Sequence, residues 1–180
     1  MKRNQKNSTD VIEKVGPIVL PLGINNSVVV NFKLTLYRLD NRNYHVLVCD
    51  PLVASGIVLL RIESACTFAH LYGSKLCDCE LQLKTALSMI SKDGGILIYA
   101  LDQHGRGVGL VNHVRVYQVE QTGIDTVEAH KALGLDVDAR HYFDALKILE
   151  DLKISKIKLL TNNPSRIDFF KTKLKYVERL

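Results

Sequence analysis

The spacing of apolar residues changes once along the chain, near residue 79, and this change constrains the fold more than any other feature. Upstream of it, segments rich in Val, Ile, Leu and Tyr are separated by Gly, Asn, Asp and Pro, a pattern typical of strands joined by turns. Within residues 30–39 apolar and polar residues alternate, as in a half-buried antiparallel strand. The pattern predicts strands at residues 17–23, 27–39, 43–50 and 56–64.

Downstream of residue 79, helical and strand-like segments alternate. The spacing predicts helices at residues 79–95, 110–123, 125–134, 142–154 and 163–174, and strands at residues 95–101, 155–162 and 175–180. Asp125 followed by Glu128 is a capping-box signal, and Pro164 suits a first helical turn. We therefore expect an α+β fold, a mixed β-sheet with flanking helices, in a single domain over residues 15–180 behind a flexible N-terminal tail, residues 1–14.

The composition narrows the choice of partners. The chain of 180 residues is 47% hydrophobic, which fits one compact domain, and its net charge of +5 fits either anionic ligands or a mildly basic surface. We expect no membrane partner, because no run of about 18 apolar residues exists. We expect no nucleic-acid partner either, because the chain has no second cysteine pair beside Cys77 and Cys79, no aromatic-rich strand and no concentrated basic run. The polar N-terminus does not read as a secretory signal, so a cytoplasmic location with reduced thiols is expected.

Three of the four cysteines, Cys66, Cys77 and Cys79, fall within residues 64–79. Thiolates and imidazoles are the ligands that Zn²⁺ prefers, so the cluster predicts a zinc site. A structural site has four protein ligands, whereas a catalytic site keeps one position for a water whose pKa the metal lowers to about 7. Three cysteines favour the open, catalytic kind, and His70, which lies between them, is the alternative fourth ligand that would close it. The simpler alternative is that all three are buried as small apolar residues.

Three further segments can bind a ligand, although each has a simpler explanation. The loop at residues 102–109 has three glycines around Arg106, which let the backbone and the guanidinium approach a phosphate, or form only a turn. Asp138 and Arg140 precede a helix and form either a functional pair or a solvated one. Thr161 ends an apolar strand, where ligands often bind in α/β arrangements, and the asparagines after it can instead cap the next helix.

In this order and spacing the segments resemble GTP cyclohydrolase II, the enzyme that opens riboflavin biosynthesis. The resemblance runs from about Gly56 to the C-terminus and rests on the blocks "RIESACTFAHLYGSKLCDCELQL", "ILIYALDQHGRGVGLVNHVRVY", "GIDTVEAHKALGLDVDARHY" and "KIKLLTNNPSRI". Enzymes of this family remove carbon 8 of guanine from GTP as formate and release pyrophosphate, which leaves a diaminopyrimidinone ribosylamine phosphate. The resemblance implies the family's fold, a zinc-dependent hydrolase and a homodimer.

The resemblance also implies roles for single residues. Zinc would be held by the three cysteines and its water would attack carbon 8, with Tyr117 assisting near the reacting base. Asp138 falls where the family's proposed base lies, and Arg140 where its proposed nucleophile toward the α-phosphate lies. Because a guanidinium ordinarily stays protonated, clamping of a phosphate by Arg140 is the alternative. Mg²⁺ would accompany the phosphates. Nucleotide contacts would map to Arg61, Gln82, His104, Gly105, Arg106, Thr126, Thr161 and Arg166.

The chain departs from the family pattern beside these residues. Ala65 and His104 stand where the family has carboxylates, one of which contacts the substrate, and His70 stands where it has an aspartate. A carboxylate only accepts hydrogen bonds, whereas histidine can donate one, and leaving the donors of a base unpaired changes selectivity by orders of magnitude. Two alternatives to a GTP cyclohydrolase therefore stay open. One is a paralogue with another nucleotide substrate, in specialised purine or pyrimidine metabolism, and the other is a non-catalytic zinc protein that binds a nucleotide or a partner.

Overall fold

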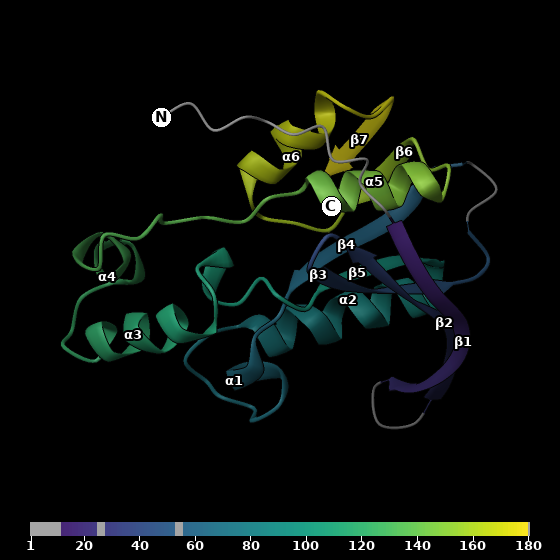
Figure 1. Cartoon of the computed structure of the whole chain (residues 1–180). Coiled ribbons are helices and arrows are strands. Elements are labelled where there is room, and N and C mark those ends of the chain that lie inside the picture. Colours follow the sequence, from purple (N-terminus) through teal and green to yellow (C-terminus); the bar gives the residue numbers. More distant parts are fainter. Residues whose placement is uncertain (1–11, 25–27, 53–55, 180) are drawn as a thin grey trace.

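The computed structural model describes residues 12–24, 28–52 and 56–179, which build one seven-stranded sheet with helices on both faces (Figure 1). The strand order across the sheet is β1-β2-β3-β5-β4-β6-β7. The predicted α+β class with a mixed sheet is confirmed. The strands are β1 (Ile12–Ile24), β2 (Val28–Leu39), β3 (Arg42–Cys49), β4 (Val58–Ser64), β5 (Gly95–Ala100), β6 (Lys156–Leu159) and β7 (Tyr176–Arg179).

The sheet has an antiparallel half and a parallel half. β1, β2, β3 and β5 pair antiparallel, whereas β5, β4, β6 and β7 pair parallel. Because Ser64 pairs with Ala100, the carboxyl ends of β4 and β5 meet at one edge of the sheet. In open α/β sheets, ligands bind outside the carboxyl ends of the strands. This edge is therefore where the fold favours a site.

The first strand begins earlier than the sequence predicts. Residues 12–14, assigned to the flexible tail, pair with residues 37–39 of β2. The Nζ atom of Lys14 also lies 2.8 Å from a carboxylate oxygen of Asp151. Glu13 and Lys14 are exposed, so the start of the strand carries no apolar alternation by which the sequence could reveal it. Residues 1–11 of the predicted tail lie outside the described residues.

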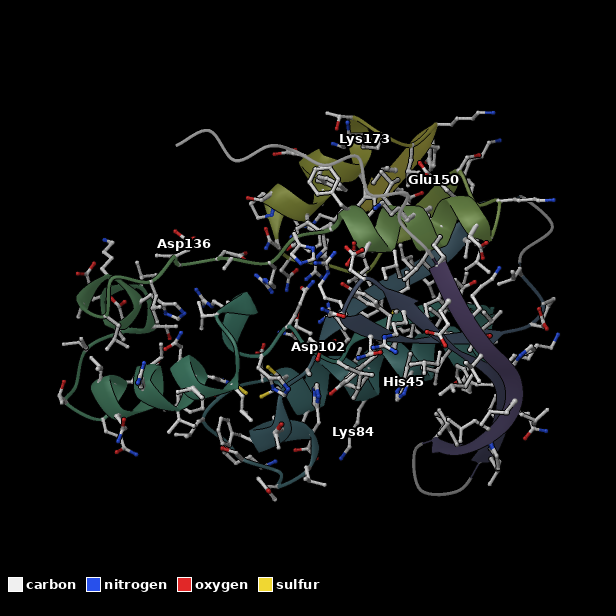
Figure 2. All side chains as sticks on the ribbon, viewed as in Figure 1. His45, Lys84, Asp102, Asp136, Glu150 and Lys173 are labelled. Carbon is white, nitrogen blue, oxygen red and sulfur yellow. The ribbon has the colours of Figure 1, made fainter. Side chains whose placement is uncertain are left out.

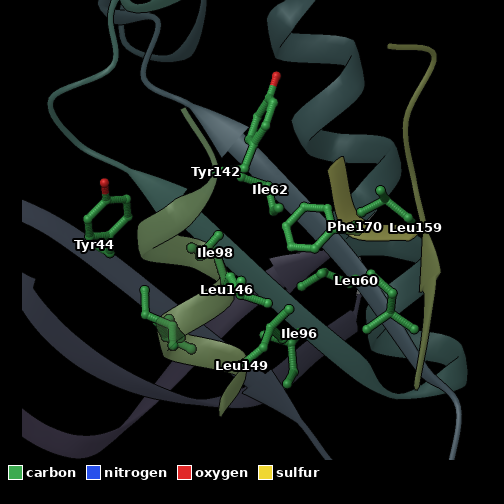
Figure 3. Close-up of a cluster of buried hydrophobic side chains, with 14 of the residues drawn as sticks. Tyr44, Leu60, Ile62, Ile96, Ile98, Tyr142, Leu146, Leu149, Leu159 and Phe170 are labelled. Carbon is green, nitrogen blue, oxygen red and sulfur yellow. The ribbon is translucent and has the colours of Figure 1, made fainter. Parts of the chain in front are cut away.

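Each face of the sheet has its own core. α2 (Cys79–Asp93) lies on one face, and α5 (Phe143–Asp151) and α6 (Pro164–Lys171) lie on the other (Figure 1). Alternation along β4 feeds both cores, since Leu60 packs in the cluster with α5 and α6 whereas Leu59 packs in the cluster with α2. Figure 3 shows the larger cluster, in which Ile96, Leu149 and Phe170 are fully buried.

The remaining helices follow the carboxyl ends of β4 and β5. α1 (Thr67–His70) follows β4, while a 3₁₀ turn (Gly105–Gly107) and then α3 (Leu110–Glu120) follow β5. α4 (Thr126–Ala132) lies against α3, and Figure 1 shows this pair as an arm beside the sheet. The predicted helices correspond to α2 through α6, and the Asp125 carboxylate caps α4 as predicted, accepting from two backbone N–H groups. α1 has only four residues, too few to show a helical period.

No helix among the described residues is long and apolar enough to cross a membrane.

Candidate active site and metal centre

A cavity of about 810 Å³ lies at the carboxyl ends of the parallel strands, walled by β4 and α2 on the sheet side and by the α3–α4 arm on the other. Residues after β6 and before α5 complete the wall. Sites for small molecules and cofactors have volumes of about 300–1,000 Å³. The cavity is therefore large enough for a nucleotide.

Cys66, Cys77 and Cys79 meet on this wall and form what we call the sulfur cluster. Their Sγ atoms lie within 4.8 Å of one another, and those of Cys66 and Cys77 are 3.7 Å apart. Zinc–sulfur bonds of about 2.3 Å in a tetrahedron separate two sulfurs by roughly 3.8 Å, so little movement would be needed to hold zinc. Figure 2 shows the sulfur atoms gathered where the start of α2 faces α3.

The surroundings distinguish these thiols from the fourth cysteine. Burial raises the pKa of the Cys66 and Cys79 thiols. Burial acts in the same direction on Cys77, but hydrogen bonds from Cys79, Tyr117 and Cys66 outweigh it and lower its pKa. Cys49 lies apart, in the apolar core under α2. The interpretation of cysteine as a small apolar residue therefore suits Cys49, whereas the other three share one cluster.

His70 lies beside the sulfur cluster without belonging to it. Its Nε2 lies 3.2 Å from the backbone carbonyl oxygen of Cys79, which can only accept, so Nε2 carries the proton. Its Nδ1 then accepts from the Tyr99 hydroxyl at 2.8 Å and from the Cys66 backbone N–H at 3.4 Å. Both ring nitrogens are engaged, so His70 braces the backbone of two cysteines and does not complete a tetrahedron.

Tyr117 of α3 borders the sulfur cluster, because its hydroxyl shares a hydrogen bond with the Cys77 thiol. Its ring packs against Phe68 of α1 at a centroid distance of 5.4 Å and against His113 at 4.8 Å. Burial, followed by the hydrogen bond and charge of Cys77, raises the pKa of the hydroxyl. Tyr117 thus presents a positioned, protonated hydroxyl that can donate a hydrogen bond to a reacting group.

Arg61, Arg140 and Arg166 form a second group on the wall, which we call the arginine cluster. Arg61 donates from Nε to Glu63 at 2.8 Å and from Nη2 to Gln82 at 2.7 Å. Arg166 is only 3% exposed, and its buried Nε has no hydrogen-bond partner among the described residues. Burial, together with the charges of Arg140 and Arg61, lowers the pKa of Arg166. A buried cation with an unpaired donor is costly unless an anion joins it.

Asp138 and Arg140 form the pair that the sequence places before α5. The Nε and Nη2 atoms of Arg140 lie 2.8 and 2.6 Å from the two carboxylate oxygens, and Asn163 donates to the same carboxylate at 3.0 Å. Burial opposes both charges, yet these bonds lower the pKa of Asp138 and raise that of Arg140. Arg140 is thus held as a cation and lines the cavity. Three guanidiniums against the carboxylates of Glu63 and Asp138 leave one excess positive charge, which favours an anionic ligand.

The glycine turn is shaped by close packing. A Cβ atom on Gly105 would lie 2.7 Å from the Cβ of His113, and one on Gly107 would lie 2.7 Å from the backbone of Ala139. Both glycines also have a positive φ, 56° and 89°. Glycine is therefore required for the turn to fit between α3 and the segment that holds Arg140, which positions part of the site whether or not the turn binds phosphate.

The structure brings most of the predicted binding residues together. His104 is the exception, because it does not line the cavity; burial lowers its pKa, and its buried Nδ1 has no partner among the described residues. Ala65 is buried at the wall, where it offers no polar group. The predicted nucleotide-binding residues that line the cavity are Arg61, Gln82, Gly105, Arg106, Thr126, Thr161 and Arg166.

Sequence reasoning missed further polar residues of the wall. Glu63 pairs with Arg61, while His113 and Glu120 lie on α3, and His130 lies on α4. The helical spacing of His113 and Glu120 could have revealed them. Once Tyr117 is assigned to the site, residues four positions before it and three positions after it must share its helix face.

Comparison with known proteins identifies the family of the chain. Residues 23–180 match the family model for GTP cyclohydrolase II. The riboflavin biosynthesis protein RibBA of Aquifex aeolicus is 45% identical over 162 residues, which cover 87% of this chain and 38% of that protein. RibBA of Salinispora tropica is 41% identical over 139 residues, 76% of this chain and 35% of that protein. The chain thus spans about a third of the length of these relatives.

A more distant likeness exists among solved structures. RibBX, a two domain 3,4-dihydroxy-2-butanone 4-phosphate synthase from A. baumannii, superposes with a TM-score of 0.46 at 17% identity over 95% of this chain and 41% of that one. Assignment rests instead on the family model, which covers most of the chain, and on the relatives above 40% identity. The chain belongs to the GTP cyclohydrolase II family.

Proposed function

We propose that the chain is a zinc-dependent hydrolase that opens the imidazole ring of GTP and releases formate and pyrophosphate, leaving a diaminopyrimidinone ribosylamine phosphate for riboflavin synthesis. The observation that carries the proposal is the presence of the sulfur cluster and the arginine cluster on the wall of one cavity. A purine nucleotide has a reacting ring at one end and phosphates at the other, so an enzyme that opens the ring needs a metal centre and a phosphate-binding group in the same cavity. A cytoplasmic homodimer is part of the same proposal.

Cys66, Cys77 and Cys79 would hold the zinc. Their sulfur donors and spacing suit the metal, and His70 is engaged elsewhere, so three protein ligands leave a position for water. When bound, zinc supplies activation of a water for attack on carbon 8 of the base. Tyr117 would hold the reacting base by donating a hydrogen bond from its buried hydroxyl beside Cys77.

The arginine cluster would bind the phosphates, with Mg²⁺ as their counterion. Arg61, Arg140 and Arg166 present guanidinium groups that match phosphate oxygens, and the unpaired Nε of Arg166 offers a donor in a buried position. Arg140 acts as a clamp in this proposal, because Asp138 holds it as a cation. Attack by Arg140 on the α-phosphate would first require Asp138 to take its proton. Gln82, Arg106, Thr126 and Thr161 would complete the contacts along the wall.

One alternative substrate is favoured by a specific observation. Ala65 offers no carboxylate and His104 does not reach the wall, so two expected partners of the guanine base are absent from the described site. A related purine or pyrimidine nucleotide is therefore the second candidate substrate.

The test is a kinetic panel with zinc-loaded protein and Mg²⁺. GTP, ATP, UTP and the guanosine monophosphate would be compared by release of formate and of pyrophosphate. We expect both products from GTP, and loss of both when a chelator removes zinc. Turnover of another nucleotide in preference to GTP would favour the second candidate, and chelator-resistant turnover would rule out the proposed role of the sulfur cluster.

A further inference from the structure

The arm formed by α3 and α4 carries polar side chains to the cavity, and three of them, His113, Glu120 and His130, have no role in the proposed function. His113, Tyr117 and Glu120 share one face of α3, because they follow one another at intervals of four and three residues. Thr126 and His130 face the same cavity from α4, again four residues apart. We refer to Glu120 and His130 as the acceptor pair.

His130 lines the cavity and has a buried ring nitrogen without a hydrogen-bond partner among the described residues. The residue is 2% exposed, and its Nδ1 lies 2.7 Å from the backbone carbonyl oxygen of Thr126. A carbonyl oxygen only accepts, so Nδ1 carries the proton and Nε2 keeps a free lone pair. Nε2 is buried and has no hydrogen-bond partner among the described residues. A buried acceptor left unpaired destabilises the site until a ligand supplies a donor.

Glu120 adds a carboxylate, which can only accept. It lines the same cavity and is half-buried, and its charge acts on His113. Within the part of the chain that the structure describes, no hydrogen bond or ion pair engages its side chain. Glu120 therefore has acceptor capacity free for a ligand, one helical turn from Tyr117.

We propose that Glu120 and His130 read the donor edge of the purine base, so that the acceptor pair takes over the role of the carboxylates missing at Ala65 and His104. This inference rests on the proposed function. Guanine presents N1–H and a 2-amino group side by side, and both are donors. Adenine presents an unprotonated N1 at the same place, which a carboxylate repels, so the acceptor pair selects guanine.

The placement of the acceptor pair agrees with the chemistry at the sulfur cluster. In guanine, carbon 8 and the N1–H and 2-amino edge lie at opposite ends of the fused rings. Along α3, Tyr117 borders Cys77, and Glu120 lies about one helical pitch, roughly 5 Å, farther on. A base held between them would have its reactive carbon toward the sulfurs and its donor edge toward Glu120.

The experiment compares GTP with inosine triphosphate, which differs only by lacking the 2-amino group. Binding to zinc-loaded protein is measured by calorimetry, and turnover by formate release. We expect the unaltered protein to prefer GTP by about 10- to 100-fold, the effect of a hydrogen bond to a charged acceptor. We assign the 2-amino group to Glu120 and N1–H to His130, so Glu120→Gln should bring this ratio close to one. Because inosine keeps N1–H, His130→Ala should weaken binding of both nucleotides and leave the ratio unchanged.

Glu128→Gln is the matched control, because it removes the same charge from α4 at an exposed position paired with Lys131. It should keep the preference for GTP, and melting temperatures and zinc content should be equal in all variants. Turnover of GTP with a preference that survives in Glu120→Gln would overturn the inference and leave the proposed function intact. Preferential GTP binding that depends on Glu120, without formate release, would support the inference and overturn the proposed function. Equal binding of both nucleotides, or of neither, would overturn the inference.

Discussion

The sulfur cluster and the arginine cluster line one cavity, yet they are assembled in different ways. The three cysteines come from one short stretch, residues 66–79, that folds as a loop around α1. The three arginines come from β4, from the segment before α5 and from α6, and they meet only because β4 lies beside β6 in the sheet. One cluster depends on local geometry, and the other on the topology of the whole domain.

The two clusters also differ in how far they are neutralised before a ligand binds. Among the described residues the thiols have one another, Tyr117 and backbone groups as partners, and no cation lies among these partners to hold them as thiolates, which a bound metal would do. The arginines already have Glu63 and Asp138 as counterions, so they keep only part of their charge for a ligand. Loss of a cysteine should therefore remove one cluster, whereas loss of an arginine should weaken the other.

The largest effect is expected for Cys66→Ser. A hydroxyl is a much poorer zinc ligand than a thiolate, so the variant should bind zinc more weakly by more than the roughly 10- to 100-fold typical of a lost outer partner. Formate release should fall to background, while GTP binding at the arginine cluster should change little. Zinc binding is measured by the zinc content of the purified protein, and GTP binding by calorimetry. Cys49→Ser, in the core under α2, is the control and should keep its zinc. The same zinc loss in both variants would mean that the sulfur cluster is not the metal site.

Arg166→Met should have the next largest effect, confined to the other cluster. Removing a buried charge that faces a phosphate costs about 2–4 kcal/mol of binding free energy, so GTP affinity should fall about 30- to 1,000-fold with zinc content unchanged. The free energy of unfolding without ligand should fall less than the binding free energy. The variant loses the bond to the Ile62 carbonyl, but it also removes a charge that burial and two neighbouring guanidiniums disfavour. Lys171→Met, on the exposed end of the same helix, is the control. Zinc loss in Arg166→Met would show that the two clusters are not independent.

This difference explains what could be predicted from the sequence. The alternation in residues 30–39, the helix periods after residue 79 and the cysteine spacing are local signals, and each led to the correct element or cluster. The bonds that hold the arginine cluster, from Arg61 to the Leu160 carbonyl and from Arg166 to the Ile62 carbonyl, join segments about a hundred residues apart, and no local period reveals them. The sequence did not predict α1 or the first residues of β1, because α1 is too short and the start of β1 too polar to show a periodic pattern.

A smaller effect on zinc affinity is expected for His70→Ala, which tests whether neighbouring residues of the same loop hold the sulfur cluster in place. The ring bridges the Cys66 N–H and the Cys79 carbonyl, so its loss should loosen the loop and lower zinc affinity about 10- to 100-fold, as for other outer partners of a metal site. Tyr99→Phe, which removes one partner of His70, should have a weaker effect in the same direction. Competition with a zinc-binding dye measures both.

The control for His70→Ala is His45→Ala, in the middle of β3, which should keep full zinc affinity. GTP affinity should be unaffected in all three variants. If the His70 variant instead lost all zinc, as Cys66→Ser is expected to, the imidazole would be a ligand in solution and the bracing role would be wrong.

The smallest effect concerns the acid stability that Asp138 gives the arginine cluster. Burial works to raise its pKa, but hydrogen bonds from Arg140 hold it below the ordinary value of 3.8. The pair therefore stabilises the fold above pH 3.8, and this contribution is lost as the pH falls through the lower folded value. The carboxylate is 33% exposed, so the contribution should stay below about 1 kcal/mol. In Asp138→Asn, urea unfolding should depend less on pH across this range, whereas the exposed Asp136→Asn should follow the unaltered protein. Equal pH dependence in the unaltered protein and both variants would mean that Asp138 does not stabilise Arg140. The arginine cluster would then lack a counterion at this position, and the contrast with the sulfur cluster would not hold there.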